Sequence, residues 1–209
     1  MEDYRTIHGT ATGEYEEKKS RFIAALSFAD SEEAAVAFLE QVRAANRTAR
    51  HNVYAYRLRE GNRERYSDDG EPAKTAGTPA LEVLQHSGLT DLIVVVTRYF
   101  GGVLLGTGGL VRAYSSAVKE GIAASKIGTM RYGVRLKICT DYNGIGKIQY
   151  ILRQNGLEAE NTVYTDQVEL TVLLAAECVP GLKKEITEAT AAKAGIEEVE
   201  KLYFVAPDA

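Results

Sequence analysis

The sequence has no apolar stretch long enough to cross a membrane. Runs such as residues 92–96 are far shorter than the roughly 20 apolar residues that a spanning helix needs. The first five residues are acidic and polar, so they lack the basic and apolar segments of a secretory signal. We therefore expect neither membrane insertion nor secretion, and we predict a cytoplasmic protein.

Cysteine is scarce. Cys139 and Cys178 are far apart, lie among apolar neighbours and follow no C-x-x-C or zinc-type spacing. Free cysteine is commonly buried, and a chain without a disulfide framework is typical of a reducing compartment. We interpret both residues as buried free thiols.

Recognisable catalytic motifs are also absent. His8, His51 and His86 form no H-E-x-x-H pattern, and no serine lies in a G-x-S-x-G elbow. A lone histidine is more often structural than catalytic, although His51 begins an arginine-bearing strand. We predict no catalytic residue, no metal site and no cofactor, and we favour a protein that is not an enzyme.

The composition is that of a folded chain with room for two domains. Of the 209 residues, 45% are hydrophobic and 26% are charged, which is close to the average of globular proteins and unlike that of disordered ones. The length allows one large domain or two ordinary ones. The order of elements restarts around Gly128, so we predict domains of residues 1–128 and 129–209.

Hydrophobic periodicity and turn residues predict the elements of both domains. A capping-box pattern at residues 30–33 precedes a helix at about 31–46. The other expected elements of the first domain are strands at 21–28, 51–59, 63–66 and 91–99, a helix from Thr78-Pro79 to Gly88 and a helix from about 108 to 126. The second domain has the order βαββαβ, which is the ferredoxin-like arrangement of one antiparallel sheet with two helices on one face. The fold class is therefore α+β.

Positive charge is concentrated in one segment, although the net charge is −4. Seven arginines lie between Arg43 and Arg65, opposed only by Glu60 and Glu64, and they are interleaved with tyrosines. Single-stranded RNA is bound through cations that contact phosphates and aromatic rings that contact bases. The alternative is a solvated hairpin whose arginines pair with nearby carboxylates and whose tyrosines belong to the core.

A glycine-rich turn, residues 101–109, separates the last of these strands from the following helix. It is neither a P-loop nor a dinucleotide fingerprint, because Thr107 replaces the P-loop lysine and Val111 replaces the last glycine. Amides at a helix start can still attract an anion such as an RNA phosphate, helped by Arg98 and Arg112. The alternative is that the glycines only permit positive φ angles and close packing.

A polar loop, residues 67–79, carries three carboxylates within four residues. The spacing of Asp68, Asp69 and Glu71 is not that of an EF-hand. We expect Asp68 and Asp69 to accept hydrogen bonds from backbone amides or to pair with nearby arginines, rather than to hold a divalent cation.

Several of these stretches together resemble the IMPACT/YigZ family. They are SDDGEP at residues 67–72, the glycine and proline pattern at 75–79, RYFGGVLLGTGGLVRAY at 98–114, KSRFI at 19–23 and ARH at 49–51. The resemblance covers essentially the whole chain. The sequence departs from the family pattern at Ala73-Lys74, where relatives usually have a pair of small residues.

The resemblance implies a fold and a field of function. It implies an N-terminal domain with the β-α-β fold of elongation factor G domain IV and a C-terminal ferredoxin-like domain similar to domain V of that factor. Eukaryotic relatives act in translational control and bind an activator of the starvation-responsive initiation-factor kinase through a region that includes an extra N-terminal domain. We recognise no such extra domain here, so the resemblance favours contact with RNA or the ribosome.

We therefore predict a translation-associated regulator that binds RNA, the ribosome or a protein partner in translational control. One alternative is a hydrolase or other phosphate-handling enzyme in which the acidic loop and the glycine-rich turn face one cleft. Another is a protein-interaction module whose acidic second domain docks on a basic partner. The candidates for RNA or anion binding are Arg50, His51, Arg57, Arg59, Arg63, Arg98, Gly101, Gly102, Gly106, Gly108, Gly109 and Arg112. The candidates in the acidic loop are Asp68, Asp69, Gly70, Glu71, Pro72 and Lys74.

Overall fold

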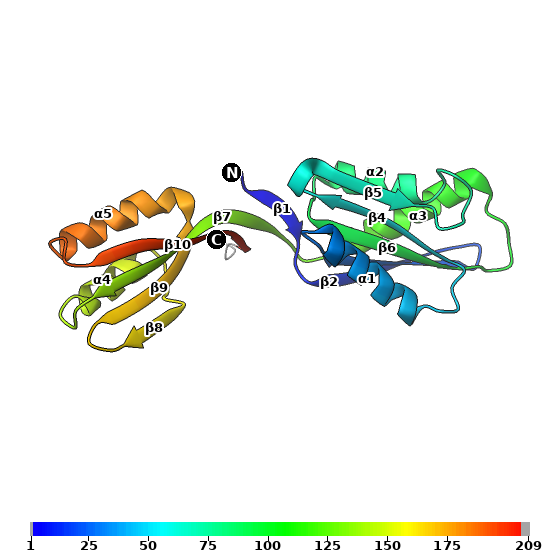
Figure 1. Ribbon diagram of the computed structural model, residues 1–209. Coiled ribbons are helices and arrows are strands. Elements are labelled where there is room, and N and C mark those ends of the chain that lie inside the picture. Colours follow the sequence, from blue (N-terminus) through cyan, green and yellow to red (C-terminus); the bar gives the residue numbers. More distant parts are fainter. Residues whose placement is uncertain (1, 206–209) are drawn as a thin grey trace. The chain divides into compact units, whose positions relative to one another are not determined.

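The computed structural model describes residues 2–205, which divide into two compact units (Figure 1). The N-terminal unit comprises Tyr4–Thr129, and the C-terminal unit comprises the described residues of Met1–Asp3 and Met130–Ala209. The division falls inside strand β7 (Ile127–Thr140). Among the described residues, no helix is both long enough and apolar enough to span a membrane.

The described elements alternate in a mixed α+β order, which confirms the predicted fold class. The other strands are β1 (Tyr4–Ile7), β2 (Thr10–Glu17), β3 (Ser20–Phe28), β4 (His51–Leu58), β5 (Arg63–Ser67), β6 (Leu92–Tyr99), β8 (Asn161–Tyr164), β9 (Val168–Ala175) and β10 (Gly195–Val205). The helices are α1 (Glu32–Ala45), α2 (Gly77–Ser87), α3 (Gly106–Ala123), α4 (Ile145–Gln154), α5 (Val179–Ala189) and the short 3₁₀ turns η1 (Glu60–Asn62) and η2 (Ala176–Cys178).

The N-terminal unit is an antiparallel sheet with helices on both faces (Figure 1). The strand order is β2-β3-β6-β4-β5, so β6 lies in the middle. Alternate residues of β6 point to opposite faces of the sheet. Val94 and Val96 pack with the residues of α2 and α3, whereas Ile93 and Val95 pack with those of α1. Burial on both faces explains the continuous apolar run that marks this strand in the sequence.

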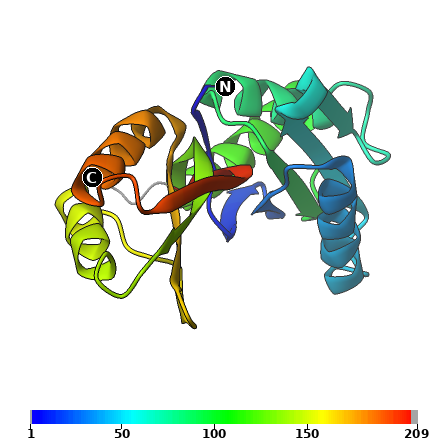
Figure 2. The ribbon, with the colours of Figure 1, turned by 60° about the vertical axis from the view of Figure 1, so that its left-hand side comes forward.

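The C-terminal unit is ferredoxin-like, as predicted (Figure 2). Its strands follow the antiparallel order β10-β7-β9-β8, with α4 after β7 and α5 after β9. Ile148 and Leu152 of α4 join Leu182 and Ile186 of α5 in one apolar core with the strands. Both helices therefore cover the same face of this sheet.

The predicted cap of helix α2 needs correction. The helix begins at Gly77, and Thr78 does not cap it. The Thr78 hydroxyl is buried without a hydrogen-bond partner in the described structure. The amides of Ala76 and Gly77 instead donate to Oδ1 of Asp68. A carboxylate from the preceding loop therefore takes the place of the local cap.

The two cysteines are free, as predicted, but they are not both buried. Cys139 is partly buried in β7, whereas Cys178 is exposed at the end of η2, directly before α5. Cys178 is the residue directly before α5 and is not part of the apolar core of this unit. Apolar neighbours in sequence therefore did not predict burial at Cys178.

Close packing of α3 against the sheet of the N-terminal unit depends on two glycines, Gly13 and Gly121. A Cβ atom on Gly13 of β2 would overlap the backbone nitrogen of Gly121 in α3. We predict that Gly13→Ala lowers the free energy of unfolding of this unit by about 3 kcal/mol, because the methyl group forces α3 away from the sheet. Urea unfolding followed by circular dichroism measures the change.

The control is Gly146→Ala in α4, where no atom lies within 4 Å of the added methyl group. There the alanine raises stability by up to about 1 kcal/mol, because it favours the helix. A Gly13→Ala variant as stable as the parent would contradict this account of the packing.

Candidate anion-binding site

A buried ion pair links three segments of the N-terminal unit. The Glu71 carboxylate of the acidic loop accepts hydrogen bonds from Nη1 of Arg98 on β6 at 2.6 Å and from the hydroxyl of Tyr114 on α3 at 2.8 Å. The side chains of Glu71 and Arg98 are only 3% and 8% exposed. Burial, together with the Glu71 charge, raises the pKa of Tyr114 well above its usual value, so the hydroxyl stays protonated and donates.

His51 stands beside this ion pair in a defined orientation. Its Nδ1 lies 2.8 Å from the carbonyl oxygen of Asp69. A carbonyl oxygen only accepts, so Nδ1 carries the hydrogen. The other ring nitrogen, Nε2, lies 4.0 Å from Oε1 of Glu71. The loop therefore fixes both the tautomer and the direction of the His51 ring.

The other two carboxylates of the loop hold the backbone, as predicted. Asp68 accepts from the amides of Lys74, Ala76 and Gly77. Within residues 2–205, no three histidine, cysteine, aspartate or glutamate side chains gather as a metal site would require. Asp68 thus orders the loop that carries Glu71.

Asp69 connects the loop to two further elements. Its carboxylate accepts from the amide of Asn52 in β4 at 2.6 Å and from Arg43 of α1 at 3.3 Å. Asp69 itself has a φ of 44°, in the left-handed region that aspartate tolerates better than most residues. These contacts place the Asp69 carbonyl where His51 reaches it.

The glycine-rich turn combines tight packing with an uncapped helix start. A Cβ on Gly101 would overlap the backbone of Lys19, and Gly102 and Gly106 have φ angles of 87° and 71°. These three positions therefore require glycine for structural reasons. Helix α3 begins at Gly106, two residues earlier than predicted, with no side-chain cap at Leu105 and no acidic residue in its first turn.

These elements surround one cavity of about 480 Å³. The acidic loop and the glycine-rich turn do line the same cavity, but Glu71 is its only carboxylate among the described residues. It is lined by Arg50, His51, Glu71, Pro72, Arg98, Phe100, Leu104, Leu105, Gly106, Thr107 and Leu110.

The cavity has cationic groups that the described structure leaves unsatisfied. Nε of Arg98 is buried without a hydrogen-bond partner. Arg50 lines the cavity, is exposed and has no ion pair in residues 2–205. Arg112, equally unpaired in that part of the chain, lies on the first turns of α3, where its Nη1 is 3.8 Å from the position of a Cβ on Gly108. The cavity wall therefore combines one exposed arginine, Arg50, with a buried arginine that has a spare donor and the positive end of an 18-residue helix, and Arg112 lies further along that helix outside the lining.

Two apolar side chains lie at the rim of this cationic cavity. Phe100 is 49% exposed and Leu104 is 84% exposed, and both line the cavity. The Phe100 ring centroid lies 5.7 Å from the guanidinium carbon of Arg98. A ligand bound here would meet the cations Arg50 and Arg98 together with a largely apolar surface.

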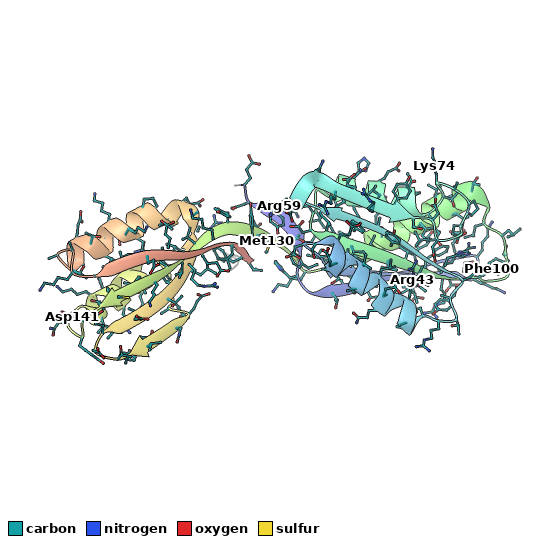
Figure 3. The ribbon with its side chains drawn as sticks, in the orientation of Figure 1. Arg43, Arg59, Lys74, Phe100, Met130 and Asp141 are labelled. Atoms are coloured by element: carbon teal, nitrogen blue, oxygen red, sulfur yellow. The ribbon has the colours of Figure 1, made fainter. Side chains whose placement is uncertain are left out.

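The structure separates the predicted binding residues into two groups. His51 pairs with Arg98 in the register of β4 and β6, whereas Arg57 pairs with Leu92 at the other end of the same strands. Six residues of strand correspond to about 20 Å. Figure 3 shows the same separation, with Phe100 and Arg59 at opposite ends of the N-terminal unit. The arginines of this segment therefore do not form one surface: Arg50 lines the cavity with the glycine-rich turn, whereas Arg57 lies at the other end of β4.

The arginines at that far end have protein partners. Arg57 donates to Glu64 and to the carbonyl oxygens of Leu84 and Leu89. Arg59 lies 3.7 Å from buried Asp91, and Arg63 lies 3.5 Å from Glu32. These contacts match the alternative of a hairpin whose arginines pair with carboxylates.

Of the predicted residues, Arg50, His51, Arg98, Gly106, Glu71 and Pro72 line the cavity. The predicted residues that are not part of its lining are Gly101, Gly102, Gly108, Gly109, Arg112, Asp68, Asp69, Gly70 and Lys74. The sequence did not single out Tyr114, Phe100, Leu104 or Thr107 as site residues. All four lie within the 98–114 stretch, and the sequence offered no other signal for them. Tyr114, for example, has the spacing of a core residue of α3, and this spacing does not reveal that its hydroxyl binds a buried carboxylate.

Comparison with known proteins identifies both units. Residues 18–122 match the Impact N-terminal domain, and residues 139–193 match a domain of unknown function, DUF1949. The chain is 35% identical over 98% of its length to "IMPACT family member YvyE" of Bacillus subtilis, with 94% of that protein covered. The chain belongs to the IMPACT family.

Other members of the IMPACT family differ in how much of the chain they share. "IMPACT family member YigZ" of Escherichia coli is 37% identical over 90% of this chain and 94% of its own. "Protein IMPACT homolog" of Dictyostelium discoideum is 40% identical over 43% of this chain, which is 27% of its own length. A crystal structure titled as that of a hypothetical protein superposes with a TM-score of 0.64 at 34% identity, covering 96% of this chain and 98% of that one.

The Glu71–Arg98 pair predicts a large stability effect from a small change. In Glu71→Gln the side chain keeps its size and one carbonyl acceptor, but the buried guanidinium loses its countercharge. We expect a loss of about 3 to 5 kcal/mol in the free energy of unfolding, because removing one partner leaves a buried charge uncompensated. Thermal and urea unfolding measure it.

Glu82→Gln on the exposed side of α2 is the matched control and should change stability by less than about 0.5 kcal/mol. The double variant Glu71→Gln, Arg98→Gln should lose less than the sum of the two single losses. Additive losses would show that the pair is not coupled.

Proposed function

We propose that this IMPACT family protein is a non-enzymatic RNA-binding protein that acts on the translation machinery, and that its N-terminal unit binds an RNA phosphate in the cavity beside Arg98. The observation that carries the proposal is the buried Arg98 guanidinium with a spare Nε donor, next to the uncapped first turn of α3. Within the described residues, this Nε donor has no hydrogen-bond acceptor, and the first turn of α3 has neither a side-chain cap nor an acidic residue.

Phosphate is the anion that suits this arrangement. An oxygen of the phosphate accepts from the amides of the α3 start, where the helix dipole favours negative charge. Arg50 and Arg98 supply planar donors, and arginine matches phosphate geometry well. The negative charge of Glu71 repels the ligand only weakly, because the carboxylate is neutralised by Arg98 and accepts a further hydrogen bond from Tyr114.

A nucleic acid fits the rim better than a free inorganic anion does. Single-stranded RNA binding combines cations for the backbone with flat apolar or aromatic surfaces for the bases. Phe100 and Leu104 offer such a surface at the mouth of the cavity. The link to translation rests on the resemblance to the IMPACT family, because eukaryotic members of that family act in translational control.

A hydrolase is the second candidate, and one observation favours it. His51 lines the cavity, its Nε2 lies 4.0 Å from Oε1 of Glu71, and its Nδ1 is held by the carbonyl oxygen of Asp69. A histidine fixed in this way can act as a general base toward a bound water. Release of inorganic phosphate from RNA or nucleotides by the parent protein, and its loss in His51→Gln, would favour this candidate.

The test of RNA binding is a salt series with single-stranded RNA and with purified ribosomes. We expect the double variant Arg50→Ala, Arg112→Ala to bind more weakly and to show a shallower dependence of log affinity on log salt. The slope should fall by about 1.4 in magnitude, since each contact to single-stranded RNA contributes about 0.7.

The matched control removes two exposed cations from the C-terminal unit, Arg153→Ala and Lys193→Ala, which have no ion pairs in the described structure. It should keep the parental slope. Failure of the parent to bind either RNA or ribosomes at low salt would contradict the proposed function, and equal slopes for both double variants would contradict the proposed site.

A further inference from the structure

We propose that the cavity selects the end of an RNA strand, taking a terminal nucleotide with its phosphate monoester seated between Arg98 and the first turn of α3. This inference rests on the proposed RNA binding and narrows it to one class of ligand. The juxtaposition that supports it is a buried arginine with an unpartnered Nε in the cavity wall, a volume suited to one nucleotide, and exposed apolar side chains in the lining.

The depth of Arg98 favours a chain end. Its side chain is 8% exposed, so a group that contacts the guanidinium must enter the cavity. An internal phosphodiester carries a sugar on each side, and both sugars would have to follow the phosphate inward. A terminal phosphate has only one sugar attached, so it reaches Arg98 while the strand stays outside.

The size of the cavity agrees with a single nucleotide. About 480 Å³ lies in the lower part of the range of about 300 to 1,000 Å³ that small-ligand pockets occupy. Proteins that bind single strands along their length instead use an open cationic groove that follows roughly 4 to 16 nucleotides. Arg57, Arg59 and Arg63 do not extend such a groove from the cavity, because they lie at the other end of the unit and contact Glu64, Asp91 and Glu32.

Charge favours the monoester over the diester. Glu71 balances the charge of Arg98, which leaves the charge of Arg50 and roughly half a charge from the helix start facing the ligand. A phosphate monoester carries about −1.5 to −2 near neutral pH, whereas a diester carries −1. The monoester therefore matches the excess positive charge of the cavity more closely.

The rim explains why a nucleotide is preferred over free phosphate. Phe100 and Leu104 are exposed apolar side chains at the mouth, on the same turn that leads into α3. A base stacked on an aromatic ring contributes roughly 1 to 3 kcal/mol in single-strand binding. A 5′-phosphate and a 3′-phosphate present the same monoester chemistry to this cavity.

The experiment compares three RNA oligonucleotides of one sequence by fluorescence anisotropy with the full-length protein. One carries a 5′-phosphate, one a 3′-phosphate, and one has hydroxyl groups at both ends. We expect at least one phosphorylated end to bind about tenfold or more tightly than the doubly hydroxylated strand, because it adds a charge-assisted hydrogen bond. The tighter of the two identifies the end.

Two variants at exposed Thr107, which lines the cavity on the first turn of α3, test the location. Thr107→Glu places a carboxylate where the phosphate is expected, yet an acidic residue in the first turn of a helix is stabilising, so the variant folds. It should abolish the preference for the phosphorylated end. Thr107→Gln has the same shape without the charge and should keep the preference.

The outcomes separate the inference from the proposed function. If no oligonucleotide binds, RNA binding itself is wrong. If all three bind equally, RNA binding stands and end selection is overturned. If the preference persists unchanged in Thr107→Glu, the end binds elsewhere and the assignment to this cavity is overturned. Competition by a nucleoside monophosphate, but not by the matching nucleoside, supports the inference.

Discussion

The ion pair between Glu71 and Arg98 is the contact on which the site depends. It joins the acidic loop to the central strand β6, and Tyr114 extends the connection to α3. A buried charge pair is stable only when its remaining donors and acceptors are satisfied. Here one donor, Nε of Arg98, has no partner in residues 2–205. The same interaction that holds three segments together therefore leaves a buried cationic donor beside the cavity.

The loop and the glycine-rich turn serve this ion pair from opposite sides. Asp68 orders the loop through backbone amides, and Asp69 positions His51 through its own carbonyl oxygen. Gly101 lets the turn pass against the backbone of Lys19, so α3 begins next to Arg98. Residues with a structural role and residues open to a ligand thus alternate along the same short stretches. This mixture explains why removal of a loop carboxylate would change both stability and binding.

Much of the fold could be predicted from the sequence, because its signals are local. The alternation in β7 and β9, the helical spacing in α1 and Gly88 at the end of α2 each depend on neighbouring residues. The site could be predicted only in part. Glu71 and Arg98 form their ion pair across 27 residues of sequence. The register of β4 and β6 places Arg57 at the opposite end of these strands from His51 and Arg98. Asp68 was expected to accept from backbone amides, but the sequence did not show that these amides belong to the start of α2, where a local threonine was predicted as the cap.

The most direct test of the central claim observes Arg98 itself. Nitrogen-edited NMR of the arginine side chains, with the Nε–H signal of Arg98 assigned by its loss in Arg98→Lys, reports on this donor during titration with adenosine monophosphate. The account predicts that this signal shifts as the ligand binds, because an unpartnered donor gains a phosphate acceptor. A binding curve detected elsewhere in the protein, with the Arg98 Nε–H signal unchanged at saturation, would contradict it.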